Sequence, residues 1–297
     1  MFDAVEAYRR LYLIRHVEEE IVRRYYPGDR RDESPMRCPV HLSIGQEGVA
    51  VGVSLALPGS HAWSTHRCHA HYLAWGGDLE RMIGELYGKA TGCSGGRAGS
   101  MHLHDSTVGF MGTSAIVGSS ISLAVGDSFA ARLANLDRIT VAFGGDSVVE
   151  TGQWWEALSF ASLHKLQILF VIEDNGLSTA TPKHKRQPEF KFPLPVEDTR
   201  DDALRAWFGV EAIRLKLPAI LRVRTRRFYE HVGMERLPGY EQYPKDDPLV
   251  TGRVAALVPL TRQSAEQVDE IEWDVRARVK AAFEKAEVAE WPHVSSS

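Results

Sequence analysis

Hydrophobic residues recur at helical spacing near both ends of the chain. At the N-terminus they predict an amphipathic helix through Val5, Tyr8, Leu11, Tyr12, Val17 and Ile21. At the C-terminus Ser264 and Gln267 have the spacing of a capping box, which opens a second long helix. Shorter helices are predicted over residues 45–57, 79–88, 116–134 and 201–215. Glycine and proline interrupt the pattern and predict loops over residues 26–39, 92–99 and 190–195.

Two short apolar runs without alternation, residues 139–143 and 168–172, have the pattern of strands that are buried on both faces. A helix through Trp154 and Leu158 lies between them. Strand, helix and strand form a crossover unit, which places the two strands parallel and side by side. With a further strand over 219–223, the sequence predicts an α/β fold with a largely parallel sheet and helices on both faces. We expect three parts, over residues 1–36, 37–260 and 261–297.

Composition excludes several classes of protein. The 297 residues are 44% hydrophobic and 25% charged, and the formal net charge is −4, so nothing favours binding to nucleic acid or to an anionic membrane. No apolar run is long enough for a membrane span, and the charged N-terminus is not a signal peptide. Three cysteines without a CxxC pair are typical of a reducing compartment. We therefore expect a cytoplasmic protein.

The two predicted central strands each end in a polar side chain. Asp146 follows the first and Asn175 follows the second. Because the carboxyl ends of parallel strands share one edge of a sheet, these side chains should reach a common ion. Carboxylate and amide oxygens suit magnesium, and Gly144 and Gly145 would let backbone N–H groups approach a phosphate. The alternative is an ordinary strand end with a solvated aspartate.

The stretch that contains both residues, GDSVVETGQWWEALSFASLHKLQILFVIEDNG, resembles the thiamine diphosphate signature. The wider chain resembles the alpha subunits of the pyruvate, branched-chain and acetoin dehydrogenase first components. That resemblance is carried by HLSIGQEGVAVGV from His41, STHRCHAHYLAWGGD from Ser64, ELYGKATGCSGGRAGSMHLHD from Glu85, AIVGSSISLAVG from Ala115 and YEHVG from Tyr229. It implies the thiamine diphosphate-binding fold.

The resemblance also implies a role for individual residues. Magnesium would be bound by Asp146, Asn175 and the backbone carbonyl of Leu177. The cofactor would be bound by His66, Arg67, Ala115, Val117, Gly145, Asp146, Ser147 and Asn175. His41 and His231 match active-site histidines that handle protons near the reacting carbon. His69 is a third candidate for a catalytic histidine, with packing or orientation of the loop as the alternative.

The resemblance further implies an activity and its partners. The cofactor would cleave or decarboxylate a 2-oxo acid or an acyloin and pass on the acyl unit. In this family a separate beta subunit supplies a carboxylate to the aminopyrimidine, so an alpha2–beta2 heterotetramer is expected. A lipoyl acyltransferase would be the acceptor. The alternative function is a transketolase-like or carboligase alpha subunit in sugar or natural-product biosynthesis, and a third is a scaffold without catalysis.

Several positions depart from the family pattern. Ser147 replaces the last glycine of GDG, Ala115 replaces a glycine, and Asp174 replaces the first member of an Asn pair. The segment after Gln187 is shorter by about one helix, which favours an altered substrate or partner contact. Val232 stands where the family has a regulatory serine. A zinc site could also be imagined from His61, His66, His69 and His71, but their spacing fits no usual zinc pattern.

Overall fold

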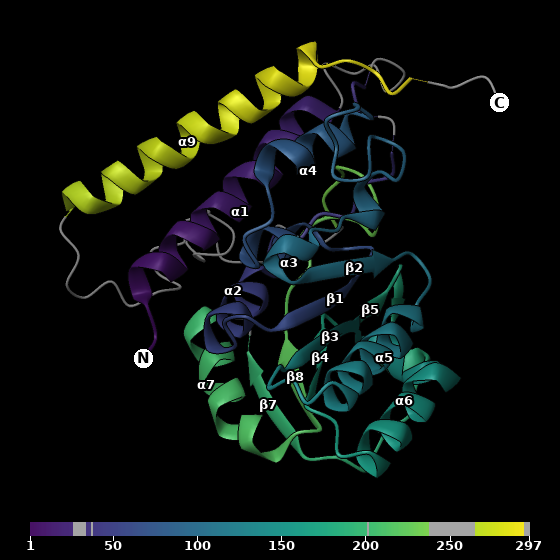
Figure 1. Ribbon diagram of the computed structural model, residues 1–297. Helices are drawn as coiled ribbons and strands as arrows, with labels where there is room; N and C mark the ends of the chain where they lie inside the picture. Colours follow the sequence, from purple (N-terminus) through teal and green to yellow (C-terminus); the bar gives the residue numbers. More distant parts are fainter. Residues whose placement is uncertain (26–33, 37, 201, 238–264, 294–297) are drawn as a thin grey trace.

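The computed structural model describes residues 1–25, 34–36, 38–200, 202–237 and 265–293, and Figure 1 shows their arrangement. Within these ranges six parallel strands form one sheet in the order β2-β1-β3-β4-β8-β7. They are β1 (His61–Thr65), β2 (Phe110–Ser114), β3 (Thr140–Gly145), β4 (Ile168–Asp174), β7 (Val196–Arg200) and β8 (Ala219–Arg224). A two-residue antiparallel pair, β5 (Leu177–Ser178) and β6 (Thr181–Pro182), lies outside this sheet. The predicted parallel α/β fold is confirmed.

Helices cover both faces of the sheet (Figure 1). Two of them, α5 and α6, lie on one face, and α2 and α7 lie on the other. The helices are α1 (Ala4–Tyr25), α2 (Glu47–Ala56), α3 (His69–Ala74), α4 (Leu79–Leu86), α5 (Ser119–Leu133), α6 (Gly152–Leu163), α7 (Ala203–Ile213) and α9 (Ala265–Val288). None of the described helices combines the length and apolar character that crossing a membrane requires.

Successive residues of the central strands enter two different hydrophobic cores. On β3, Val141 and Phe143 join the larger core while Ala142 joins the smaller one. On β4, Leu169 and Val171 likewise face the larger core, and Ile168, Phe170 and Ile172 face the smaller one. This explains why both runs are apolar without alternation: each residue is buried against one layer of helices or the other.

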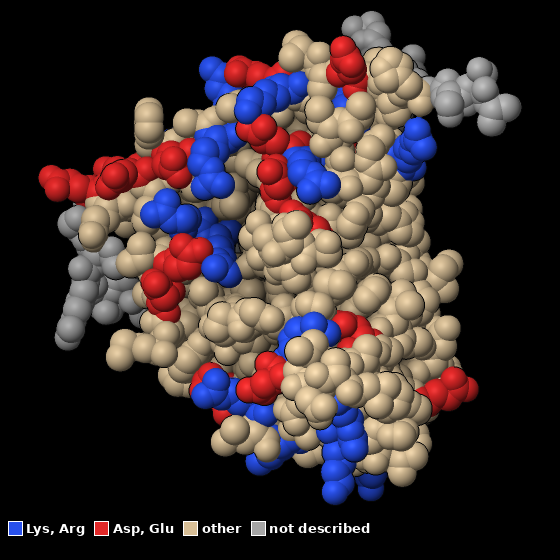
Figure 2. Space-filling model, in the orientation of Figure 1, with Lys and Arg blue, Asp and Glu red and all other residues tan. Residues whose placement is uncertain are grey.

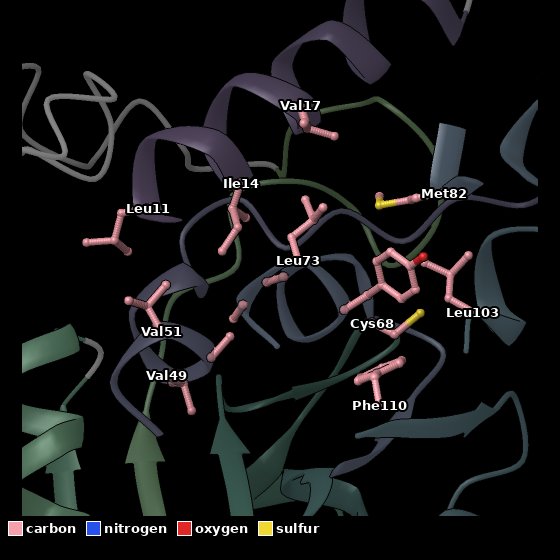
Figure 3. Close-up of a cluster of buried hydrophobic side chains, with 14 of the residues drawn as sticks. Leu11, Ile14, Val17, Val49, Val51, Cys68, Leu73, Met82, Leu103 and Phe110 are labelled. Atoms are coloured by element: carbon pink, nitrogen blue, oxygen red, sulfur yellow. The ribbon is translucent and has the colours of Figure 1, made fainter. Parts of the chain in front are cut away.

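The larger core continues above the sheet into the N-terminal helix. Figure 3 shows Leu11, Ile14 and Val17 of α1 close to the helices that precede and follow β1. Helix α9 packs against α1 and α4, and the ion pair between Arg9 and Asp274 spans 3.6 Å. Figure 2 shows acidic and basic side chains intermixed over this end of the molecule. The two terminal helices are thus joined to the fold by apolar packing and by surface charge.

Most predicted elements are confirmed, and where bounds were predicted the ends differ by at most three residues. The predicted loop over 26–39 lies partly outside the described residues, and the capping serine Ser264 lies outside them. The predicted boundaries near 37 and 260 also fall on such residues, so the division into three parts remains a prediction. The sequence analysis missed α3, β1, β2 and β7. After Gln187 the predicted loop over 190–195 is present, and the edge strand β7 follows at positions to which the sequence analysis assigned no element.

Candidate cofactor and metal site

Asp146 and Asn175 lie at the same edge of the sheet, as the sequence predicts. Strands β3 and β4 are parallel neighbours, with Gly145 opposite Glu173. Each polar residue follows its strand directly, and both line a single cavity of about 200 Å³. The two residues thus meet at one cavity, and the metal site itself remains a prediction.

The loops at the carboxyl ends of β1, β2, β3, β4 and β8 contribute residues to this cavity, together with the loop before α2. All but one of the predicted site residues line it: His41, His66, Arg67, Ala115, Val117, Gly145, Asp146, Ser147, Asn175, Leu177 and His231. Ligands of open α/β sheets bind at this edge. Chain segments separated by up to 190 residues thus converge on one concave site.

Three histidine rings face one another in the cavity. The ring centroids of His41 and His66 are 4.5 Å apart, and that of His231 lies 5.0 Å from the first and 5.1 Å from the second. Burial lowers the pKa of His41 to about 2, of His66 to about 3 and of His231 to about 4, and the nearby charge of Arg67 acts in the same direction. These imidazoles are therefore neutral near pH 7, and each has one N–H donor and one acceptor nitrogen. The Nδ1 atom of His41 is buried without a hydrogen-bond partner.

Arg67 connects the loops that carry two of these histidines. Its Nη1 donates to the carbonyl of Leu42 at 2.5 Å, and its Nη2 donates to the carbonyl of His231 at 3.1 Å. Burial lowers the pKa of Arg67 to about 10, which still leaves the guanidinium charged at neutral pH. Since a guanidinium has five N–H donors, others remain available to a ligand in the cavity.

Asp146 is a buried carboxylate with a cationic neighbour. Its side chain is 3% exposed, and burial raises its pKa while the charge of Arg186 acts against that rise. The Nη2 atom of Arg186 donates to Oδ2 of Asp146. The contact involves only one of the two carboxylate oxygens. Arg186 is thus the positive partner of one oxygen, Oδ2, and the other oxygen, Oδ1, is available to a second positive partner.

The side chain of Asn175 is oriented by two neighbours. Its Nδ2 donates to Oε1 of Gln46 at 2.8 Å, and its Oδ1 accepts a hydrogen bond from the backbone N–H of Leu177 at 3.0 Å. The same turn carries the Leu177 carbonyl that the resemblance assigns to the metal. The amide oxygen and this carbonyl belong to one short turn at the cavity wall.

The cavity also has room beside the backbone of β3. A Cβ built on Gly145 would meet no atom within 4 Å, although Gly145 lines the cavity. Gly144, one residue earlier, packs tightly on Val148 instead. The cavity thus combines open space beside a backbone amide with a guanidinium and a buried carboxylate that has a free oxygen. A diphosphate is bound by amide and guanidinium N–H groups, and a magnesium ion is bound by carboxylate oxygens. The residues present therefore fit this group.

His69 does not line the cavity, and the expectation that it is catalytic is corrected. Its side chain is fully buried, with Nδ1 at 2.6 Å from Oε1 of Glu18 and Nε2 at 2.7 Å from Oγ of Ser100. Both ring nitrogens are engaged, so neither faces a ligand. Of the two roles considered, the structure supports orientation of the loop.

The four histidines of the imagined zinc cluster point in different directions. His61 contacts Asp127, and His71 contacts Ser64 and Glu173. Only His66 of the four lines the cavity. Among the described residues, the histidines close enough to share an ion are His41, His66 and His231, whose potential ligand atoms lie within 4.8 Å of one another.

Sequence reasoning missed several residues that shape the site. Gln46, Glu173 and Arg227 line the cavity, and Arg186 contacts Asp146. Arg227 is 4% exposed and donates from Nη2 to the carbonyl of Thr179 at 2.6 Å. The basic run 222–227 was the available signal for Arg227, but nothing in the sequence connects Gln46 or Arg186 to positions so distant along the chain.

Comparison with known proteins gives relatives for nearly the whole chain. The model of the dehydrogenase E1 component family matches residues 9–191. The alpha subunit of the pyruvate dehydrogenase E1 component from Zymomonas mobilis is 34% identical, over 98% of this chain and 86% of its own length. The alpha subunit of acetoin:2,6-dichlorophenolindophenol oxidoreductase from Bacillus subtilis is 37% identical, over 65% of this chain and 62% of its own length.

Solved structures support the fold. Transketolase from Leishmania mexicana matches with a TM-score of 0.55 at 15% identity, over 96% of this chain and 48% of that one. Transketolase from Campylobacter jejuni matches with a TM-score of 0.56 at 15% identity, over 96% of this chain and 50% of that one. At this identity the likeness concerns the fold alone, and this chain spans about half of each transketolase. From the family match and the relatives together, the chain belongs to the dehydrogenase E1 component family.

Proposed function

We propose that this chain is the alpha subunit of a thiamine diphosphate- and magnesium-dependent enzyme. The enzyme cleaves or decarboxylates a 2-oxo acid or an acyloin and passes on the acyl unit. The observation that carries the proposal is the position of Asp146 and Asn175, which lie at neighbouring strand ends in a cavity that also contains Arg67 and three neutral histidines. Two of the relatives named above support it, one an alpha subunit of a pyruvate dehydrogenase E1 component and the other an alpha subunit of an acetoin oxidoreductase.

In this proposal magnesium is bound by Asp146, Asn175 and the carbonyl of Leu177. The diphosphate is bound by Arg67 and His66 and by the backbone of Gly145 and Ser147. A guanidinium suits a phosphate because two parallel N–H groups can donate to two oxygens. The backbone at Ala115 and Val117 contacts the aminopyrimidine ring. The residues of this chain thus fix the position of the cofactor and neutralise its charge.

Thiamine diphosphate, when bound, would supply the nucleophilic carbon and the electron sink that cleavage next to a carbonyl needs. His41 and His231 move protons beside the reacting carbon. Their lowered pKa values, about 2 and about 4, keep both rings neutral, so each has an unprotonated nitrogen that can accept a hydrogen bond from a substrate hydroxyl. The negative charge of a bound diphosphate would raise both pKa values toward the range in which a histidine is an effective base. Both rings pack against His66, and Arg67 holds the backbone carbonyl of His231, so the two histidines are placed side by side in the cavity.

A beta subunit completes the site in this proposal, in an alpha2–beta2 heterotetramer, and a lipoyl acyltransferase accepts the acyl group. Two apolar residues on the cavity wall support a contact with another subunit there, because Ile116 is 69% exposed and Val117 is 45% exposed. Exposed apolar residues beside a ligand site are typical of an interface. The cytoplasmic location remains a prediction from the sparse cysteines, which are free in the structure.

A second candidate keeps the cofactor and changes the reaction to transketolase-like or carboligase chemistry. One structural observation supports this second candidate. The segment after Gln187, which departs from the family, lines a separate cavity of about 520 Å³ through Pro188, Phe190 and Phe192. That cavity shares Asp146 with the first. A substrate screen with the assembled enzyme separates the two candidates by the acceptor that turns over.

The test is co-production with a beta subunit, followed by titration of thiamine diphosphate in the presence of magnesium. We expect saturable binding and turnover of a 2-oxo acid or acyloin. Asp146→Ala should abolish both, while Asp137→Ala, at an exposed position outside the cavity, should change neither. Normal cofactor-dependent turnover in the Asp146→Ala variant would refute the metal assignment, and binding without any turnover would favour the scaffold.

A further inference from the structure

The segment that follows the proposed metal-binding turn folds back onto the metal-binding carboxylate. After β4, the short strands β5 and β6 pair, and the N–H of Lys183 donates to the carbonyl of Gly176 at 2.8 Å. The 3₁₀ turn over Lys183–Lys185 then brings Arg186 to Asp146. Asn175 and Leu177, which would bind the ion, are therefore in the same closed segment as Arg186, which contacts Asp146.

Arg186 is held by more than one group. Its Nη2 donates to Oδ2 of Asp146, its Nη1 donates to Oε1 of Glu150, and its Nε donates to the carbonyl of Thr181 at 3.0 Å. The side chain is only 9% exposed. Gln187 adds a hydrogen bond from Nε2 to the backbone carbonyl of Asp146 at 3.2 Å. The guanidinium is thus a fixed part of the wall behind Asp146.

The direction of this contact matters for a metal ion. Arg186 contacts Oδ2 and restrains the carboxylate, while Oδ1 accepts no hydrogen bond from the described residues. Carboxylates that bind metals are commonly held by a second group in this way, and loss of that group typically lowers metal affinity about 10- to 100-fold. If Arg186 instead competed with the ion for Asp146, it would have to move away from the carboxylate when the ion binds. Arg186 is anchored to Glu150 and Thr181 as well, so it can stay where it is.

We propose that Arg186 is a positioning residue for the metal-binding carboxylate of Asp146. It orients Oδ1 toward the cavity and holds the 176–187 segment, with its Leu177 carbonyl, against Asp146 and Glu150. The proposal rests on the proposed function, because it assumes that Asp146 binds the ion. Metal affinity would then depend on Arg186, although Arg186 is not itself a metal ligand.

The test is a titration of the purified complex with Mn²⁺, followed by electron paramagnetic resonance, in the presence of thiamine diphosphate and without substrate. We expect Arg186→Gln to weaken Mn²⁺ binding about 10- to 100-fold. Arg186→Lys, which keeps a charge and one donor, should restore part of that affinity. Lys185→Gln removes a positive charge at the exposed neighbouring position and should leave Mn²⁺ affinity unchanged. Glu150→Gln, which removes the negative charge of one anchor of Arg186 and leaves a weaker amide acceptor, should weaken binding by a smaller factor.

The outcomes separate this inference from the proposed function. A Mn²⁺ site that disappears in Asp146→Ala but is unchanged or tighter in Arg186→Gln refutes the positioning role alone. If wild type and Asp146→Ala bind Mn²⁺ equally, the metal assignment fails and this inference fails with it. Should Arg186→Gln not fold, Arg186→Lys and Glu150→Gln carry the test, and unchanged Mn²⁺ affinity in both refutes the role.

Discussion

The Nδ1 atom of His69 lies 2.6 Å from Oε1 of Glu18, and both side chains are fully buried. The other carboxylate oxygen of Glu18 accepts a hydrogen bond from the backbone N–H of Ser43 at 2.6 Å. Helix α1 is therefore tied to the start of α3, which follows Arg67, and to the loop that contains His41. These contacts explain why the N-terminal helix matters for a site to which it contributes no lining residue.

We predict that Glu18→Ala destabilises the fold by about 2 kcal/mol or more, because two buried donors lose their acceptor. Urea denaturation measures this effect. Glu19→Ala, at the adjacent exposed position of the same helix, should stay within about 0.5 kcal/mol of wild type. Equal stabilities for the two variants would show that the buried contact contributes little.

A second prediction concerns the space beside Gly145. Its φ of −75° and ψ of 171° are allowed for alanine, and an added Cβ meets no atom within 4 Å. Gly145→Ala should therefore fold normally, with stability within about 0.5 kcal/mol of wild type. If the diphosphate occupies that space, the methyl group should weaken thiamine diphosphate binding about tenfold or more, a loss of about 1.4 kcal/mol or more.

Isothermal titration calorimetry on the complex measures this affinity. Gly152→Ala is a matched control, because its Cβ also meets no atom within 4 Å and Gly152 does not line the cavity. It should bind the cofactor like wild type. Wild-type affinity in Gly145→Ala would place the diphosphate elsewhere in the cavity.

Helices could be predicted from their periodic apolar faces, and strands only where burial is uniform along the segment. Strands β3 and β4 are buried on both faces, so their apolar runs were recognised. Strand β7 lies at the edge of the sheet, and its VEDTR sequence alternates exposed and half-buried residues, with charged side chains that edge strands often carry. Strands β1 and β2 are short and polar, and they gain their stability from neighbours that lie far away in the sequence.

The candidate site shows the same limit. Asp146 and Asn175 could be placed together because parallel strands bring their carboxyl ends to one edge, a rule that needs no tertiary detail. The contacts of Asn175 with Gln46 and of Asp146 with Arg186 join positions 129 and 40 residues apart, and no periodicity encodes them. His69 was misjudged because sequence places it two residues after Arg67, while its ring turns away to Glu18.

Arg67 should prove sensitive in two ways. Arg67→Met removes the donors to the carbonyls of Leu42 and His231 and also the proposed phosphate ligand. We expect thiamine diphosphate affinity to fall about 100-fold, since hydrogen bonds to charged groups contribute up to about 3 kcal/mol. Arg67→Lys should rescue little of it, because an ammonium cannot reproduce the planar fork of donors. Calorimetric titration of the complex measures both variants.

Arg132→Met serves as the control for Arg67, because Arg132 is exposed on α5 and does not line the cavity. It should bind the cofactor like wild type. If Arg67→Lys bound the cofactor as tightly as wild type, a point charge would suffice and the bidentate contact would be refuted.

The three cavity histidines predict a fall in stability in acid. Their pKa values in the fold are about 2 for His41, about 3 for His66 and about 4 for His231, against 6.5 for an ordinary histidine, and burial is the main cause. Between pH 6.5 and about 4 the unfolded chain binds protons at these positions that the folded chain does not bind. In this window the free energy of unfolding therefore rises with pH, and above it the three groups have no further effect.

His231→Gln tests this origin of the pH dependence. It removes one titrating ring, so the slope of unfolding free energy against pH should become shallower below pH 6.5 by at most one proton. At about pH 8 the pH-dependent contribution of that ring is absent in wild type and variant alike. His102→Gln, at an exposed position, should leave the slope as it is in wild type. Urea denaturation at about pH 5, 6 and 8 gives the slope of unfolding free energy against pH for wild type and for each of the two variants. An unchanged slope in His231→Gln would mean that this ring is protonated in the folded chain as readily as in the unfolded one, which its packing against two other imidazoles and its closeness to Arg67 argue against.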